Sequence, residues 1–195
     1  MNTLLISFCV SFVITFLLIR YQHLHGHVSG DHDLAGPQKM HAQSVPRIGG
    51  LSIAFGLLAG SLYISFKDNV WNVVCPILLA CILVFGIGLT EDIKKNIGVQ
   101  KRLLVIAISA IIAIIFIPAP ITTLDIRHLD WLLGFTVISI FFSCFAITGL
   151  ANAYNIIDGF HGLASMIAII TLGAILYIAF KHNDLLLFKL SLCML

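Results

Sequence analysis

The sequence predicts an all-α polytopic membrane protein, and two observations carry this prediction. Of the 195 residues, 59% are hydrophobic and 10% are charged, with a mean hydropathy of +1.06; soluble domains average about 25% charged residues. The sequence also contains several uncharged stretches whose length is close to the ~20 residues that a helix needs to cross the hydrocarbon core of a bilayer. Because lipid requires each segment to satisfy its own backbone polar groups, such long stretches indicate helices.

Six stretches are predicted to span the membrane. Their bounds are Thr3–Ile19, Ile48–Phe66, Val70–Thr90, Leu103–Leu124, Trp131–Ala151 and Leu163–Phe180. The first lacks the basic region and the small-residue cleavage site of a signal peptide, so it is interpreted as a span. A seventh apolar stretch, Leu185–Leu195, has 11 residues and contains Lys189. It is too short to cross a bilayer, which predicts a truncated seventh element at the end of a single transmembrane domain, residues 1–195.

The charges of the connections predict the topology. Alternation of the spans puts Arg20–Arg47, Glu91–Arg102 and Asn152–Gly162 on one side. This side holds seven basic residues, namely Arg20, Lys39, Arg47, Lys94, Lys95, Lys101 and Arg102. The other side holds three, namely Lys67, Arg127 and Lys181. Because positive charge concentrates in cytoplasmic loops, we expect a multi-pass protein of the inner (plasma) membrane whose active face is cytoplasmic.

Two adjacent carboxylates, Glu91 and Asp92, follow the third span and precede Lys94 and Lys95. Hard oxygen ligands suit Mg²⁺, which typically uses one or two carboxylates together with substrate phosphates. A carboxylate here could also accept a proton during catalysis. The alternative is an ordinary hydrated loop that caps a transmembrane helix.

The sequence PRIGG, which begins at Pro46, leads into the second span, and His41 lies shortly before it. The free N–H groups of a helix N-terminus and an adjacent arginine, Arg47, favour binding of an anion. The alternative is a flanking basic residue followed by small residues that serve helix packing.

The stretch NAYNIIDGFHGLASM begins at Asn152, between two long apolar segments. Asn152, Asn155 and Asp158 recur at i, i+3 and i+6, so a helical continuation would put them near one face. Amides and an acid at a membrane boundary are costly unless they have partners. The alternative is that the two amides hydrogen-bond between helices as packing contacts.

Together these motifs resemble the polyprenyl-phosphate N-acetylhexosamine-1-phosphate transferases, which are membrane enzymes of the glycosyltransferase family 4 type. NAYNIIDGFHGLA is similar to the family signature N-A-x-N-x-x-D-G-x-D-G-L-A, and GLTEDIKK is similar to its G-x-x-D-D-x-x-K element. KMHAQSVPRIGGLS is similar to the family's first cytoplasmic loop. The motifs occur in family order on one predicted face and span His41–Ala164.

The resemblance implies transfer of a HexNAc-1-phosphate, or a related sugar 1-phosphate, from a UDP-sugar to undecaprenyl phosphate with release of UMP. Such a reaction begins a cell-envelope glycan pathway, for example that of a lipopolysaccharide. It further implies Mg²⁺ as cofactor, with Mn²⁺ as an alternative, and the lipid bilayer as surroundings. No nucleic-acid partner is expected, and a homodimer is a candidate assembly.

The resemblance also assigns roles to individual residues. Glu91, Asp92 and Asp158 are the expected catalytic residues, and Asn155 with Asp92 is expected to hold the metal. The expected substrate-binding residues are Asn152, His161, Lys94, Lys95, Arg47 and His41.

The chain departs from the family pattern at two positions. Glu91 replaces the usual aspartate, which moves the carboxylate by about 1.5 Å, and His161 replaces the second aspartate of D-G-x-D-G. Both bear on the identity of the substrate, and the resemblance implies that Glu91→Asp is tolerated or even improves turnover. The family's later metal aspartate and histidine-rich loop would follow Leu195. The 195 residues therefore correspond to the N-terminal half of a roughly ten-helix transferase, and we expect them to insert without catalysing.

Two other functions are compatible with a membrane chain of this composition. A transporter typically buries ionisable groups near the middle of the bilayer, whereas these acids lie at the ends of spans. A non-catalytic remnant or a membrane assembly partner is the second alternative, favoured for this chain by the missing half.

Overall fold

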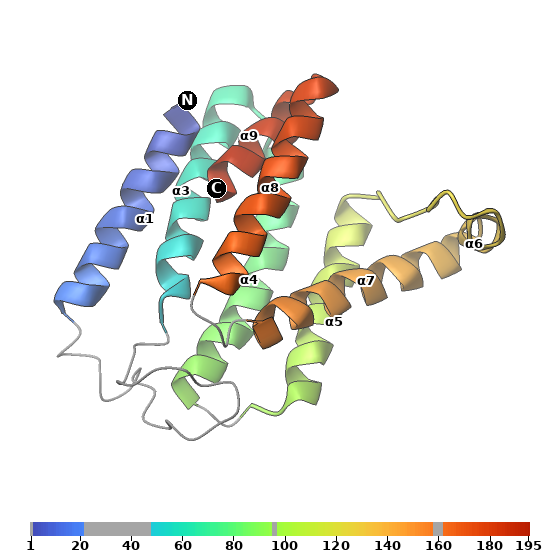
Figure 1. The fold of residues 1–195 in the computed structure, drawn as a ribbon, viewed down its shortest axis with the longest axis horizontal. Coiled ribbons are helices and arrows are strands. Elements are labelled where there is room, and N and C mark those ends of the chain that lie inside the picture. The colour runs from blue at the N-terminus through green and yellow to red at the C-terminus, as the bar shows by residue number, and fades with distance from the viewer. Residues whose placement is uncertain (1, 22–47, 95–96, 158–161) are drawn as a thin grey trace. The chain divides into compact units, whose positions relative to one another are not determined.

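The computed structural model describes residues 2–21, 48–94, 97–157 and 162–195. These residues form eight helices, six of which are long and apolar enough to cross a membrane (Figure 1). The prediction of an all-α multi-pass membrane protein is confirmed. The helices group into two compact units.

One unit consists of Met1–Trp71 and Ile157–Leu195. Its helices are α1 (Asn2–Arg20), α3 (Gly50–Asp68), α8 (Leu163–Lys181) and α9 (Leu185–Met194). In Figure 1, α1 and α3 lie side by side, and α9 packs against both and against α8. Asn2 at the start of α1 donates to the Tyr63 hydroxyl near the end of α3 at 3.3 Å, so the two helices are antiparallel. The predicted seventh element is thus the short helix α9.

Small residues bring α1, α3 and α9 close together. Cys193 Sγ on α9 lies 2.9 Å from Ser7 Oγ on α1, and both atoms face Gly60 on α3. A methyl group on Gly60 would overlap both atoms. Helices in lipid lack a hydrophobic driving force for association, so close packing of small residues and hydrogen bonds between helices supply the attraction.

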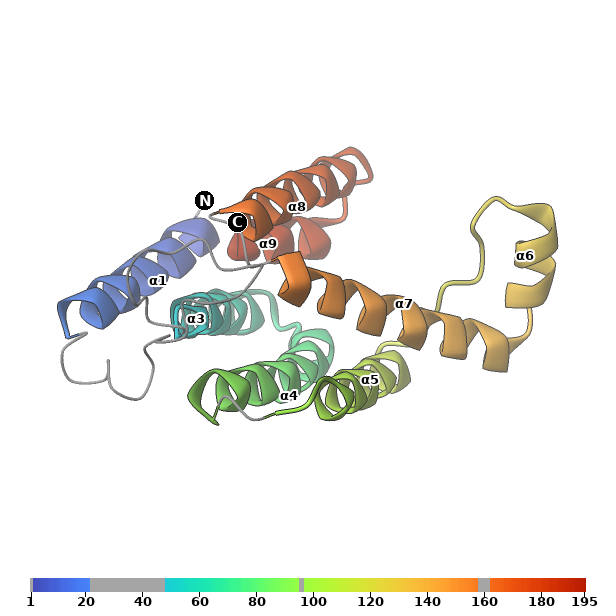
Figure 2. The same cartoon turned by 60° about the horizontal axis from the view of Figure 1, so that its bottom comes forward.

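The other unit is Asn72–Ile156. It contains most of α4 (Trp71–Lys94), followed by α5 (Val99–Phe116), α6 (Arg127–Leu133) and α7 (Thr136–Ile157). Ser109 Oγ of α5 donates to the Ala80 carbonyl of α4 at 2.8 Å, and the two helices lie side by side (Figure 2). Cys144 Sγ of α7 donates to the Ala107 carbonyl of α5 at 3.5 Å. Helix α5 is therefore bonded to α4 and to α7.

The predicted span Leu103–Leu124 was wrong at its end, because α5 stops at Phe116. Pro118 and Pro120 follow; proline lacks an N–H group, and its ring is incompatible with the preceding helical turn. The chain is not helical again until Arg127. Ile121 in this stretch donates its N–H to Ser143 Oγ at 2.7 Å and accepts from Ser139 Oγ at 2.7 Å. Two buried serines of α7 thus satisfy backbone groups that the interrupted helix leaves unpaired.

The predicted span Trp131–Ala151 corresponds to α7, but its start was wrong, because residues before Thr136 belong to a separate short helix, α6. Helix α6 ends at Leu133, where Phe135 N bonds to the Leu132 carbonyl at 3.2 Å in a tight turn, and α7 begins at Thr136. Asp130 of α6 accepts from the Leu124 N–H at 2.6 Å and so holds the short helix against the preceding segment. Apolar composition continues across this turn, which is why it was not visible as a boundary.

Two helices continue past their predicted ends. Helix α4 runs to Lys94 and not to Thr90, and α7 runs to Ile157 and not to Ala151. Each span was predicted to end directly before a polar motif, which begins at Glu91 in one case and at Asn152 in the other. No Gly or Pro interrupts either helix at that point. Residues expected in loops therefore lie on the last turns of regular helices.

The close contact at Gly60 leads to a stability prediction. We expect Gly60→Ala to lower the apparent Tm of the detergent-solubilised protein, because overpacking typically costs about 1–3 kcal/mol. Gly86→Ala on α4 is the matched control, since no described residue has an atom within 4 Å of its added methyl group. Equal Tm values for the two variants would contradict the packing of α1, α3 and α9 described above.

Candidate active site at the ends of three helices

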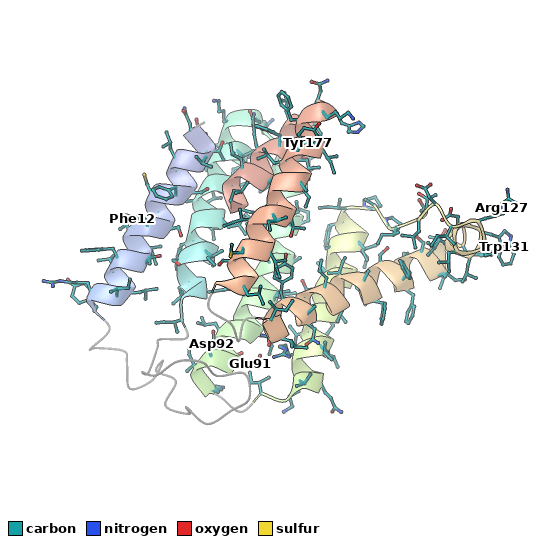
Figure 3. The ribbon with its side chains drawn as sticks, viewed as in Figure 1. Phe12, Glu91, Asp92, Arg127, Trp131 and Tyr177 are labelled. Atoms are coloured by element: carbon teal, nitrogen blue, oxygen red, sulfur yellow. The ribbon has the colours of Figure 1, made fainter. Side chains whose placement is uncertain are left out.

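The acid pair lies on the final turn of α4. Glu91 and Asp92 are both partly buried, and Figure 3 shows them at this end of the helix. Thr90 Oγ1 just before them bonds back to the carbonyls of Gly86 and Ile87 at 2.9 and 2.8 Å. This polar side chain is satisfied by the helix itself, so the helix continues through the acid pair.

A third charged residue, Arg102, reaches the acid pair from the first turn of α5. That turn begins after Gly98, whose carbonyl accepts from the N–H groups of Lys101 and Arg102 at 3.0 and 3.3 Å. Arg102 is only 7% exposed. Its Nη1 donates to Glu91 Oε1 at 2.7 Å, which is a short, charge-assisted contact.

The same guanidinium also reaches α7. Arg102 Nη2 donates to Asn152 Oδ1 at 3.0 Å. Asn152 lies on the extension of α7 that was predicted to be a loop, and Asn155 lies exposed close to the end of the same helix. One side chain therefore joins the ends of α4, α5 and α7, and brings together two motifs that are far apart in the sequence.

Among the described residues of this unit, three enclosed polar atoms have no hydrogen-bond partner. They are Glu91 Oε2, Arg102 Nε and Thr148 Oγ1. Thr148 precedes Asn152 by one turn of α7, so it lies on the same side of that helix. Buried polar groups are nearly always paired, and an unpaired carboxylate oxygen costs free energy. Such atoms are expected where a ligand, an ion or a water molecule completes the site.

The predicted site residues have different outcomes. Glu91 and Asn152 are brought together through Arg102, while Asp92 and Lys94 lie on the last turns of α4 and Asn155 on α7. The other predicted residues lie outside the described part of the chain: Asp158, His161, Lys95, Arg47 and His41. Their assigned roles stay predictions.

Sequence reasoning missed Arg102 as a member of this cluster. It entered only as one of the basic charges that set the topology. A signal was present, because Arg102 is the last cation before an uncharged helix and lies across a short connection from an acid pair. Basic residues that flank spans usually point to water, so that signal alone does not predict burial.

The oxygen donors of the cluster partly match the needs of a divalent metal. Among the described residues, no three His, Cys, Asp or Glu side chains are grouped as a metal site. Asp92 and Asn155 nevertheless offer hard oxygen donors on α4 and α7. Glu91 Oε2 is a carboxylate oxygen that receives no hydrogen bond from the part of the chain that the structure describes. Oxygen donors of this kind suit Mg²⁺, which needs few protein ligands when a phosphate supplies others.

The described residues form six helices that are capable of spanning a membrane, which defines a multi-pass membrane protein. Its polar site is a buried cluster of charged and amide groups at the ends of three helices. The chain belongs to glycosyl transferase family 4, whose model matches residues 74–195, more than half of its length. The matched region contains the whole cluster of Glu91, Arg102 and Asn152.

Curated relatives agree with this membership. The chain is 29% identical over 182 residues to a protein of Saccharolobus solfataricus, provisionally named a UDP-N-acetylglucosamine–dolichyl-phosphate N-acetylglucosaminephosphotransferase. It is 27% identical to the phospho-N-acetylmuramoyl-pentapeptide-transferase of Lactobacillus helveticus, and 30% identical to the undecaprenyl-phosphate alpha-N-acetylglucosaminyl 1-phosphate transferase of Thermotoga maritima.

These matches cover most of the chain but only part of each relative. They include 92%, 91% and 70% of this chain, and 54%, 58% and 40% of the three relatives in the same order. The chain thus spans about half the length of the curated relatives that it matches. No solved structure matches the chain.

The ion pair within the cluster leads to a second stability prediction. Removing one partner of a buried ion pair typically costs about 3–5 kcal/mol. We expect Arg102→Gln and Glu91→Gln to fall near the lower limit, because the Glu91 side chain is 26% exposed. The double variant should regain part of this loss, since it leaves no unpaired charge. The measurement is the apparent Tm in detergent.

Lys189→Gln is the matched control, because it breaks the 2.6 Å pair between Lys189 and Asp68, whose side chains are 31% and 28% exposed. Exposed pairs contribute only about 0–1 kcal/mol. Shifts of equal size for Arg102→Gln and Lys189→Gln would contradict a special role of burial.

Proposed function

We propose that the protein containing this chain transfers a sugar 1-phosphate from a UDP-sugar to a polyprenyl phosphate and releases UMP. The observation that carries this proposal is the contact of Arg102 with both Glu91 and Asn152. Through it, the acid pair and the amide motif, which are two of the three segments that resemble the transferase family, share one cluster. The names of the curated relatives support the same reaction class.

The position of the cluster suits these two substrates. A polyprenyl phosphate keeps its chain in the bilayer and its phosphate at the interface, while a UDP-sugar arrives from water. Groups at the ends of spanning helices can meet both, whereas groups in the middle of the spans can meet only the lipid. The acceptor is proposed to be undecaprenyl phosphate, the donor a UDP-HexNAc, and the product an intermediate of a cell-envelope glycan.

In the proposed reaction, an oxygen of the lipid phosphate bonds to the phosphorus that carries the sugar. The bond from that phosphorus to the bridging oxygen of UMP breaks, and the electron pair leaves with UMP. Asp92 and Glu91 would orient the lipid phosphate or accept its proton, and Asp158 would act with them. Lys94, Lys95, Arg47, His41, Asn152 and His161 would bind the anionic substrates. Catalysis of phosphoryl transfer depends mainly on such positioning and charge stabilisation.

A divalent cation would complete the site, and Mg²⁺ is proposed, with Mn²⁺ as an alternative. Asp92 and Asn155 would hold it, and when bound it would neutralise charge on the phosphates. We also propose that residues 1–195 made alone insert without catalysing, because the matched relatives are almost twice as long.

The proposed active face is cytoplasmic, and this leads to a prediction on topology. In a background without the five native cysteines, we expect a cysteine at Ser44 or Asn96 to resist an impermeant thiol reagent in intact cells. A cysteine at Asn69 or Asn183 should react. Permeabilised cells control for sites that are buried in the protein. The reverse pattern would place the motifs outside the cell and rule out a cytosolic donor.

The acids lead to a prediction on activity. We expect Asp92→Asn and Asp158→Asn to lower kcat of the full gene product about 10²–10³-fold, the usual loss when one group that stabilises the transition state is removed. The assay follows Mg²⁺-dependent transfer from radiolabelled UDP-GlcNAc to undecaprenyl phosphate. Asp184→Asn is the control, because the Asp184 side chain caps α9 by accepting from the Leu187 N–H at 2.9 Å. Near-normal rates in both site variants would reduce these acids to helix-end groups.

A further inference from the structure

The two carboxylate oxygens of Glu91 have different surroundings. Oε1 accepts the 2.7 Å bond from Arg102, whereas Oε2 is enclosed and has no hydrogen-bond donor among the described residues. Because Oε1 is bonded to Arg102, the carboxylate cannot rotate freely without losing its ion pair. The arrangement thus fixes the direction in which Oε2 points.

Arg102 itself does not resemble an ordinary flanking cation. Basic residues at the ends of spans extend their charged groups to water, but Arg102 is 7% exposed and uses two nitrogen atoms on two other helices. A planar guanidinium can make both contacts at once, whereas a lysine ammonium is a point charge without this fork. An arginine at position 102 is therefore suited to orient the two side chains that it contacts.

The length of the acid at position 91 also matches this contact. Shortening Glu91 to aspartate would withdraw the carboxylate by about 1.5 Å, the length of one carbon–carbon bond. The 2.7 Å contact would then exceed hydrogen-bonding distance unless the helix ends moved. The resemblance alone led to the expectation that Glu91→Asp is tolerated, and the ion pair leads to the opposite expectation.

We infer that Arg102 is a positioning residue of this site, matched in length and charge to a glutamate at position 91, and that it orients Glu91 and Asn152 for the transfer step. This inference rests on the proposed function. Arg102 touches no reacting atom in this role. It holds the acid of α4 and the amide of α7 in fixed directions, so that both reach the substrate phosphates without reorganisation.

The test measures transfer kinetics and apparent Tm for the full gene product with Arg102→Gln, Glu91→Gln, the double variant and Glu91→Asp. Positioning partners typically contribute about 10–100-fold to activity. We expect a loss of kcat of this size for Arg102→Gln and for Glu91→Asp, with little change in the KM for the UDP-sugar. The double variant should regain Tm but not kcat. Lys189→Gln is the control and should retain normal kcat.

The outcomes separate this inference from the proposed function. If the unaltered protein transfers no sugar phosphate, the proposed function is wrong, and the positioning role is withdrawn with it. If the unaltered protein is active and folded Arg102→Gln keeps its kcat, only the positioning role is overturned. Recovery of both Tm and kcat in the double variant would likewise overturn it, because the pair would then be only a structural link. Full activity of Glu91→Asp would contradict the matched length.

Discussion

Burial of the Arg102 guanidinium is the constraint on which the candidate site depends. A buried cation is stable only with charged or hydrogen-bonding partners close by, and this one has Glu91 at 2.7 Å and Asn152 at 3.0 Å. Both partners lie on helical turns that continue past the apolar part of their spans. If α4 ended at Thr90 and α7 at Ala151, neither side chain would be held on a regular helix to meet Arg102.

The same requirement explains the irregular part of this unit. Prolines end α5 early, and the backbone that follows needs hydrogen-bond partners in surroundings with little water. Ser139 and Ser143 of α7 provide them at Ile121. In the unit that contains α1, α3 and α9, the close approach of helices at Gly60 likewise relies on small and weakly polar groups. Hydrogen bonds and small residues thus contribute to the helix contacts in both units.

Membership of glycosyl transferase family 4 gives the cluster a chemical context. Within that context, one carboxylate oxygen of Glu91 is committed to an ion pair with Arg102. A glutamate at this position is therefore not a neutral replacement for a shorter acid. The contact depends on the length of both side chains, Glu91 and Arg102. The properties of the site therefore follow from this pair and not from the acid motif alone.

The sequence by itself determined the membrane class and the approximate spans. The length of an apolar segment and its lack of charge are local properties, and they decide whether the segment can cross a bilayer. The sequence also drew attention to Glu91 and Asn152, because polar groups at the ends of apolar segments need partners. It misplaced the end of α5, although Pro118 was a visible signal, and it missed the turn before Thr136, where composition does not change. Only the tertiary structure showed that Arg102 is buried and joins three helices. A cation that extends to water and one that bridges two helices have the same local sequence, because the difference lies in partners that are distant along the chain.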